Sequence, residues 1–175
     1  MINKILFLDI DGVLNSRQLF LMKDEKEPDG ANTPFEADLN FMQSHIDPHN
    51  VWNLKYILDQ VPDLYVVFSS SWRDAFTMPQ FHTILFGHNL NPNRFIGKTP
   101  RKLSSSRANE IHMWLQDNSF SGKWCTLDDH PIFDLENPEK CLEIQTDPWL
   151  GLTVLDAIKV IKYFKPEFKE PVIHL

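Results

Sequence analysis

The segment "KILFLDIDGVLN", residues 4–15, is the stretch that decides the fold class. Residues 4–9 carry a continuous apolar run, which is typical of a strand covered on both faces. Asp9 and Asp11 stand at the end of this run, one residue apart, and Gly12 follows them. Burying two carboxylates there is costly unless a cation or hydrogen-bond donors pair with them. The segment therefore predicts a buried strand that ends in a functional site.

Strand and helix patterns alternate along the rest of the chain, which indicates an α/β fold with mainly parallel strands. Asp47 and Ser106 are the expected N-caps of two helices, and Pro79 is expected to break or kink a third. Further strands are predicted at 64–69, 94–97, 123–129 and 141–146, and helices at 47–61, 72–86, 106–118 and 153–164.

Residues 16–46 differ from this pattern because they are polar and show no sustained period. A loop of this length inside a compact domain is usually functional or mobile. With 175 residues and no second-domain boundary, the chain is expected to be one domain over 1–175. Within it, 16–46 would be a small cap or a mobile insert.

The charge, the cysteines and the lack of a long apolar stretch limit the classes to which this protein can belong. The net charge of −7 makes the molecule as a whole repel nucleic acid and anionic membranes. No apolar stretch is long enough to span a bilayer, and the first residues lack the layout of a signal peptide. Cys125 and Cys141 lie in apolar segments and are expected to be buried thiols, which fits a reducing compartment. We therefore expect a soluble, cytoplasmic protein, with a monomer favoured.

Three predicted strands end in polar side chains of related chemistry. The first ends in Asp9 and Asp11, the second in "SSSWR" (69–73), and the fourth in Asp128 and Asp129. The carboxyl ends of parallel strands share one edge of a sheet, where ligands bind. An oxygen-only cluster of carboxylates suits Mg²⁺, and a hydroxyl with a nearby cation suits a phosphoryl group.

A structural reading competes with the catalytic one. D-x-D-G alone is a weak signal, since a turn with a left-handed glycine produces the same pattern. Three strand ends with the same chemistry, in this order, favour the catalytic reading.

The chain resembles the haloacid dehalogenase (HAD) superfamily. "FLDIDGVLN", "VVFSSSWR" and "CTLDDHP" are similar to its motifs one, two and four. "GKTP", "RANEIHMWL" and "TDPWLGLT" further resemble the HAD domain family of Swiss Army Knife RNA repair proteins. The resemblance covers residues 4 to about 164. It implies a three-layer, Rossmann-like fold with a mainly parallel five-stranded sheet and a minimal cap.

The resemblance also implies roles for the acids. Asp9 matches the nucleophile that forms an aspartyl-phosphate, and Asp11 matches the general acid and base. Asp9, Asp11, Asp128 and Asp129 would hold Mg²⁺, with Asp11 contributing its backbone carbonyl. Because dehalogenases lack the second acid, Asp11 favours phosphate-ester chemistry over carbon–halogen cleavage.

Motif two supplies a hydroxyl to the phosphoryl oxygens, and Ser69 matches it. Ser70 is the alternative, because the run of three serines leaves the register open by one residue. Backbone amides from Ile10 to Gly12 and at Ser70 would donate to the same oxygens.

Motif three requires a lysine or arginine near the start of the helix before the fourth strand. Arg107 has this position, and Lys98 and Lys102 are the alternatives. Arg73 either bridges motif two to a neighbouring acid or binds substrate.

Five basic residues and no acid lie between Asn91 and Asn109, including Arg94 and Arg101. They form either an ordinary solvated loop or a ridge that guides a nucleic-acid end. Trp72 and Trp149 could stack a base, although core packing is the expected role of both. His130 is expected to line the site.

Together these features predict a Mg²⁺-dependent phosphomonoesterase. Its phosphorylated substrate would be a nucleotide or an RNA or DNA phosphate end, and no membrane is involved. The alternatives are a non-catalytic module that binds a phosphorylated ligand, and a phosphotransferase that passes the phosphoryl group to an acceptor other than water.

Overall fold

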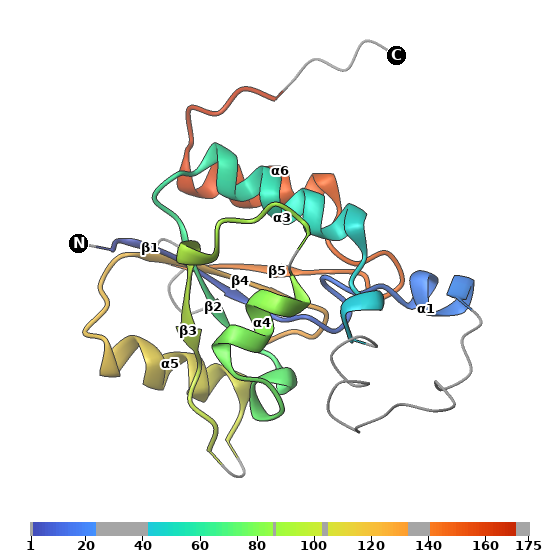
Figure 1. The fold of residues 1–175 in the computed structure, drawn as a ribbon. Helices are drawn as coiled ribbons and strands as arrows, with labels where there is room; N and C mark the ends of the chain where they lie inside the picture. Colours follow the sequence, from blue (N-terminus) through green and yellow to red (C-terminus); the bar gives the residue numbers. More distant parts are fainter. Residues whose placement is uncertain (1, 24–41, 86, 103–104, 133–140, 171–175) are drawn as a thin grey trace.

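A five-stranded parallel sheet forms the centre of the molecule (Figure 1). The computed structural model describes residues 2–23, 42–85, 87–102, 105–132 and 141–170. Every neighbouring pair of strands in it is parallel, in the order β3-β2-β1-β4-β5, which confirms the predicted fold class. The strands are β1 (Lys4–Leu8), β2 (Tyr65–Phe68), β3 (Phe95–Lys98), β4 (Lys123–Asp128) and β5 (Cys141–Gln145).

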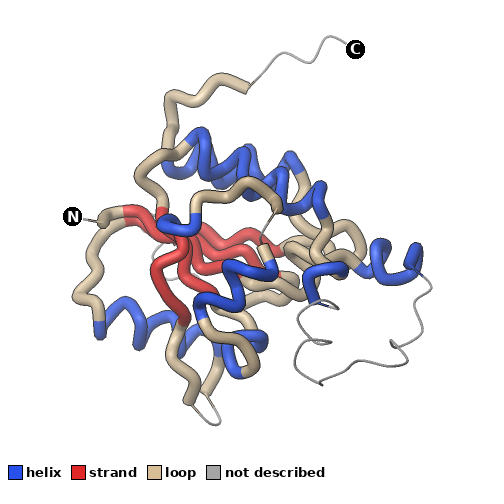
Figure 2. Tube along the Cα trace, viewed as in Figure 1, coloured by secondary structure: helices blue, strands red, loops and turns tan. Residues whose placement is uncertain are grey.

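Helices cover both faces of this sheet, so the fold has three layers. Figure 1 shows α3 (Pro48–Gln60) and α6 (Val154–Phe164) side by side on one face and α5 (Arg107–Asp117) on the other. Figure 2 shows the same sandwich, with the strands between two layers of helix. The shorter helices are α1 (Arg17–Lys23), α4 (Met78–Ile84) and the 3₁₀ turns η1 (Ser71–Asp74) and η2 (Pro92–Arg94).

Strand β1 is buried on both of its faces. Leu6 and Leu8 belong to the larger core, which also contains residues of α3 and α6. Ile5 and Phe7 point the other way, into a smaller core under α5. Successive side chains of a strand face opposite sides of the sheet, so a central strand between two helical layers must be apolar at every position.

Helix α5 begins where the sequence predicts. The side chain of Ser106 accepts a hydrogen bond from the backbone N–H of Asn109, which caps the helix. Asp47 caps α3 in the same way, with Pro48 in the first turn. The Ser106 cap fixes Arg107 as the first residue of α5, and this placement matters for the site.

The predicted helix over 72–86 is wrong in its extent. The chain instead forms η1 and then the separate helix α4, which begins at Met78. Pro79 lies in the first turn of α4, where the missing N–H of proline has no helical partner to lose. It therefore helps to start a helix rather than to kink one.

Part of the predicted loop over 16–46 is also helical, because Arg17–Lys23 forms α1. Residues 24–41 lie outside the described residues, so a cap or mobile insert there stays a prediction. Cys125 and Cys141 are buried free thiols, as predicted. In the described ranges, no helix has the length and apolar character needed to cross a membrane.

Candidate active site

The carboxyl ends of β1, β2 and β4 meet at one edge of the sheet. The backbone N–H of Asp9 donates to Leu127 O on β4 at 2.9 Å, and the N–H of Ser69 donates to Leu8 O on β1 at 2.8 Å. These bonds continue the ladders one residue beyond the strands. They place the residues after β1, β2 and β4 next to one another, as the parallel topology requires.

Asp9 and Asp128 share one cation at this edge. Arg107 Nη1 lies 2.5 Å from Oδ2 of Asp9 and 2.5 Å from Oδ2 of Asp128. Both acids are buried, with 3% of Asp9 and 2% of Asp128 exposed. Arg107 reaches them because the Ser106 cap puts it at the end of α5 nearest the sheet edge. One arginine therefore bridges two buried carboxylates from neighbouring strands.

The electrostatic balance of this trio favours a further cation. Burial raises the pKa of Asp9, and the charge of Arg107 only partly offsets this. Burial, together with the nearby charge of Asp9, raises the pKa of Asp128 to about 6. Burial by itself would lower the pKa of Arg107, but the charges of Asp9 and Asp128 outweigh it and raise the pKa. A single guanidinium does not neutralise both acids.

Asp11 is held by a different set of groups. Its Oδ1 accepts from Asn15 Nδ2 at 2.9 Å, and its Oδ2 accepts from the indole Nε1 of Trp72 at 2.9 Å. Ser71 Oγ lies 3.5 Å from the same Oδ2. Asp11 itself is exposed, whereas Asn15 and Trp72 are buried. Two buried side chains therefore orient the Asp11 carboxylate, while Asp11 itself remains open to solvent.

Gly12 lets the loops after β1 and β4 approach each other. Its φ is +68°, and a Cβ built there would lie 2.6 Å from Cβ of Asp129. Both facts require glycine. The Gly12 N–H donates to Asn15 Oδ1 at 2.8 Å, and the Ile10 N–H donates to Asp9 Oδ1 at 2.7 Å. These two backbone amides, predicted to bind phosphate, therefore donate to side chains of their own loop in this structure.

In motif two, the hydroxyl that contacts the nucleophile candidate belongs to Ser70. Its interaction with the Asp9 carboxylate offsets part of the rise in the pKa of Asp9, and it accepts a hydrogen bond from the N–H of Trp72 at 3.3 Å. The Ser69 hydroxyl is buried and has no partner within the described part of the chain. Which of the two serines donates to a phosphoryl group stays a prediction.

Two predicted substrate-binding residues, Lys98 and Arg73, have other partners in this structure. The Lys98 ammonium donates to Arg73 O and Phe76 O, each at 2.9 Å, so it stabilises the loop after β2. Arg73 forms a buried ion pair with Glu110 of α5 and donates to Ser70 O at 2.6 Å. Of the two roles considered for Arg73, the structure shows the bridge from motif two to a neighbouring acid, and the substrate contact stays a prediction.

Three of the five basic residues between Asn91 and Asn109 have side chains engaged with other parts of the fold. The Arg94 guanidinium donates to Leu64 O and Val61 O, so it stabilises the end of α3 rather than facing solvent. Lys98 and Arg107 are also engaged inside the fold. Only Arg101 and Lys102 remain as exposed cations of this stretch, and Arg101 lies 3.4 Å from Asp74.

The two tryptophans have different environments. Trp72 is 7% exposed and packs in the larger core, as predicted. Trp149 is 47% exposed on the loop after β5, so the prediction of core packing is wrong for it. The chain around Trp149 supports α1, since the N–H of Arg17 donates to Pro148 O at 3.0 Å.

A second group of possible metal ligands adjoins the trio. Ligand atoms of Asp128, Asp129 and His130 lie within 4.8 Å of one another. His130 Nδ1 is 2.6 Å from Asp129 Oδ1, and its ring is exposed. With Asp9 these acids form an oxygen-rich cluster in which negative charge exceeds the one arginine, so the residues fit a hard divalent cation.

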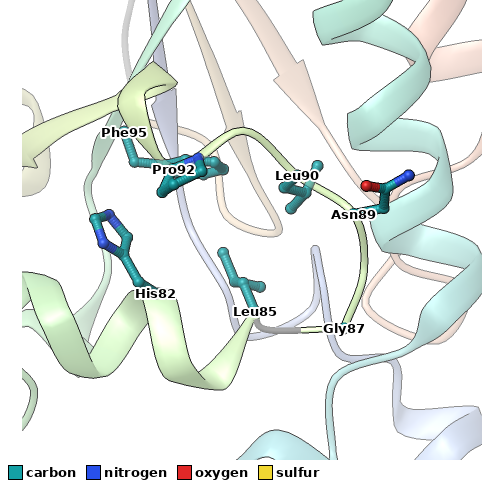
Figure 3. Close-up of a pocket in the computed structure, with 7 residues that line it drawn as sticks. All are labelled: His82, Leu85, Gly87, Asn89, Leu90, Pro92 and Phe95. Atoms are coloured by element: carbon teal, nitrogen blue, oxygen red, sulfur yellow. The ribbon is translucent and has the colours of Figure 1, made fainter.

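Of two cavities in the described part of the chain, one lies beside these acids and the other does not. One of about 160 Å³ adjoins the trio, with walls that include Arg107, Asp128, His130 and Ile132. Another of about 490 Å³ lies between α4 and the segment before β3, and contains none of the acids (Figure 3). Figure 3 shows its lining side chains, which include His82, Leu85, Leu90, Pro92 and Phe95.

Comparisons with known proteins agree with this geometry. Residues 5–157 match the family described as the HAD domain in Swiss Army Knife RNA repair proteins. The chain belongs to this family. It is accordingly a HAD-type hydrolase, and phosphatase chemistry is the general activity that membership supports.

Among solved structures, the chain is similar to a haloacid dehalogenase-like family hydrolase from Streptococcus pneumoniae. The identity is 13%, the match covers 94% of this chain and 99% of that one, and the TM-score is 0.47. The comparison with curated proteins gave no significant match.

The sequence does not predict several contacts that shape this HAD site. Asn15 and the indole of Trp72 hold Asp11, and Glu110 pairs with Arg73. Thr146 Oγ1 donates to Gly12 O at 2.8 Å and ties the loop after β5 to motif one. Asn15 stands four residues after Asp11, which was the one local signal available for it.

Proposed function

We propose that this protein is a Mg²⁺-dependent phosphomonoesterase that works through an aspartyl-phosphate on Asp9. The observation that carries the proposal is the arrangement around Asp9. This buried carboxylate is contacted by a guanidinium and a hydroxyl, with the second acid of motif one two residues away. A cationic and a hydroxyl donor beside the attacking oxygen are what a phosphoryl transition state requires.

In the first step, an Oδ atom of Asp9 attacks phosphorus while the bond from phosphorus to the leaving oxygen breaks. Asp11 gives its proton to that oxygen, so an alcohol leaves rather than an alkoxide. Arg107 and the Ser70 hydroxyl, which contact Asp9 in this structure, would donate to the phosphoryl oxygens.

In the second step, water attacks the phosphorus of the aspartyl-phosphate. Asp11, now ionised, takes a proton from this water, and the bond between phosphorus and Asp9 breaks. The products are inorganic phosphate and the original carboxylate, so one acid serves both half-reactions.

The magnesium site would be built from Asp9, Asp128 and the backbone carbonyl of Asp11, with Asp129 beside them. These residues fit the ion because Asp9 and Asp128 lie beside one guanidinium that does not neutralise both, and Asp129 lies beside Asp128. A bound Mg²⁺ would supply further positive charge to the phosphoryl oxygens.

The proposed substrate class is a nucleotide or an RNA or DNA phosphate end. The family description, with its RNA repair proteins, supports this class. The basic ridge does not support it, because three of its members face inward. If the class is right, phosphorylated oligonucleotides or nucleoside monophosphates are hydrolysed with a higher kcat/KM than p-nitrophenyl phosphate. Equal or lower values for all of them would contradict the class and leave the chemistry standing.

The chemistry itself is tested with p-nitrophenyl phosphate, in Mg²⁺ and in EDTA. We expect hydrolysis in Mg²⁺ that EDTA abolishes and that Asp9→Asn lowers by at least about a thousandfold. The matched control is Asp59→Asn, at an exposed carboxylate that pairs with Lys55 on the surface of α3. Near-normal activity of Asp9→Asn would contradict the assignment of the nucleophile.

A further inference from the structure

The tryptophan of "SSSWR" has a buried ring and an indole N–H that reaches the site. Its ring is buried in the larger core beside Phe76, with the ring centres 5.8 Å apart. Its indole N–H nevertheless reaches Oδ2 of Asp11, an exposed residue, at 2.9 Å. A buried indole usually finds some hydrogen-bond partner, but here the partner is the carboxylate proposed to transfer the proton.

The backbone of Trp72 is fixed as firmly as its ring. Ser70 caps the 3₁₀ turn η1 by accepting from the Trp72 N–H, and the interaction of its hydroxyl with Asp9 partly offsets the rise in the pKa of that carboxyl. Motif two therefore touches both acids of motif one, Asp9 through Ser70 and Asp11 through the indole. A shift of η1 would move both contacts together.

The two donors to Asp11 leave it able to exchange a proton. Trp72 Nε1–H and Asn15 Nδ2–H each occupy one carboxylate oxygen. Ser71 Oγ also approaches Oδ2, at 3.5 Å, so Oδ1 is the oxygen with a second lone pair that remains for a proton. The indole is a donor only, so it cannot compete for the proton that Asp11 carries. The arrangement fixes the orientation of the carboxyl group and leaves it able to bind and release a proton.

We propose that Trp72 is a positioning residue, whose indole N–H holds Asp11 in the orientation needed for proton transfer to the leaving oxygen. This inference rests on the phosphatase function proposed above. It gives Trp72 a role other than stacking a base, because the ring faces the core and only its N–H faces the site. Proton transfer depends on geometry within hydrogen-bond reach, so loss of this bond should cost rate rather than binding.

The test is Trp72→Phe, which keeps an aromatic ring and removes the N–H. The readout is kcat/KM for two phosphomonoesters, since kcat/KM reports the steps up to release of the first alcohol. An alkyl phosphate needs a proton on its leaving oxygen, whereas p-nitrophenolate leaves without one. We expect kcat/KM to fall about tenfold for the alkyl phosphate and less than about twofold for p-nitrophenyl phosphate.

A structural role of Trp72 would give a different result. Damage to packing would lower kcat/KM for both substrates by the same factor, and that outcome overturns the inference. So does an unchanged kcat/KM for the alkyl phosphate. The control is Trp114→Phe, because the Trp114 indole packs on Phe7 in the smaller core and makes no contact with Asp11. It should lower stability without changing the ratio between the two substrates.

A second measurement does not depend on activity. The chain has five tryptophans, and each indole N–H gives its own signal in a ¹H–¹⁵N spectrum. The signal that disappears in Trp72→Phe is assigned to Trp72. Asp11→Ala should move that signal more than the others, and an unmoved signal would overturn the hydrogen bond. If the wild-type protein hydrolyses no phosphomonoester but this signal moves, the proposed function fails while the contact stands.

Discussion

At the scale of single residues, the site is dominated by an imbalance of charge. Asp9 and Asp128 are buried beside one guanidinium, and burial raises the pKa of both. A carboxyl whose pKa is higher in the folded than in the unfolded protein binds more protons when folded. The free energy of unfolding therefore falls as pH rises through the window between the two pKa values, here from about 4 to about 6 for Asp128.

This imbalance predicts that Asp128 destabilises the metal-free protein at neutral pH. Without metal, at pH 8, Asp128→Asn should raise the free energy of unfolding by about 2 kcal/mol, because it removes an uncompensated buried charge. At pH 4 the variant and the wild type should be alike. Urea unfolding in EDTA at both pH values measures this.

The same variant distinguishes the effect of Mg²⁺ on stability from the effect of the Asp128 charge itself. Mg²⁺ should stabilise the wild-type protein at pH 8 and should stabilise Asp128→Asn much less. A variant that is less stable than the wild type at pH 8 in EDTA would show that Arg107 does compensate both acids. Asp59→Asn, at the surface, serves as the control for the substitution itself.

At the scale of elements, helix α5 is joined to motif two by a buried ion pair. The Arg73 side chain is 2% exposed and that of Glu110 is 3% exposed. Glu110 lies three residues after Arg107 on α5, so the same helix face carries both groups. Lys98 further stabilises the loop of motif two through two backbone carbonyls. The position of Arg107 relative to Ser70 therefore depends on this pair.

Breaking the pair from one side should be more harmful than replacing both partners. Glu110→Gln leaves the Arg73 guanidinium buried without a counter-charge, which should lower the free energy of unfolding by about 3–5 kcal/mol. The double variant Arg73→Met with Glu110→Leu should recover most of this loss, since apolar residues of similar size often replace buried ion pairs at little cost. Urea unfolding of the three proteins measures both effects. A double variant as unstable as Glu110→Gln would contradict this account.

At the scale of the whole molecule, the sequence predicts those features of the site that follow from the parallel topology of the sheet. Apolar runs at 4–9, 64–69 and 123–129 mark buried parallel strands, and parallel strands necessarily bring their carboxyl ends together. Asp9 and Asp128 therefore meet although 118 residues separate them, a spacing read directly from the sequence. The Ser106 cap, a local signal, places Arg107 beside them.

The sequence does not predict which groups the long basic side chains bind. Arg94 and Lys98 read as part of a basic surface, yet they bind backbone carbonyls of segments more than twenty residues away. A lysine or arginine in a loop has the same local pattern whether it faces water or a helix end. The role of Trp72 is hidden for the same reason, because its partner Asp11 lies 61 residues earlier.

The most direct measurement of the central claim is to trap the covalent intermediate. The protein is mixed with p-nitrophenyl phosphate and Mg²⁺, quenched in acid during turnover, digested, and examined by mass spectrometry. We expect one added phosphoryl group on the peptide that contains Asp9. This adduct should be sensitive to hydroxylamine, as an acyl phosphate is, and absent in Asp9→Asn. Turnover without such an adduct, or an adduct on another residue such as Ser70, would contradict the central claim.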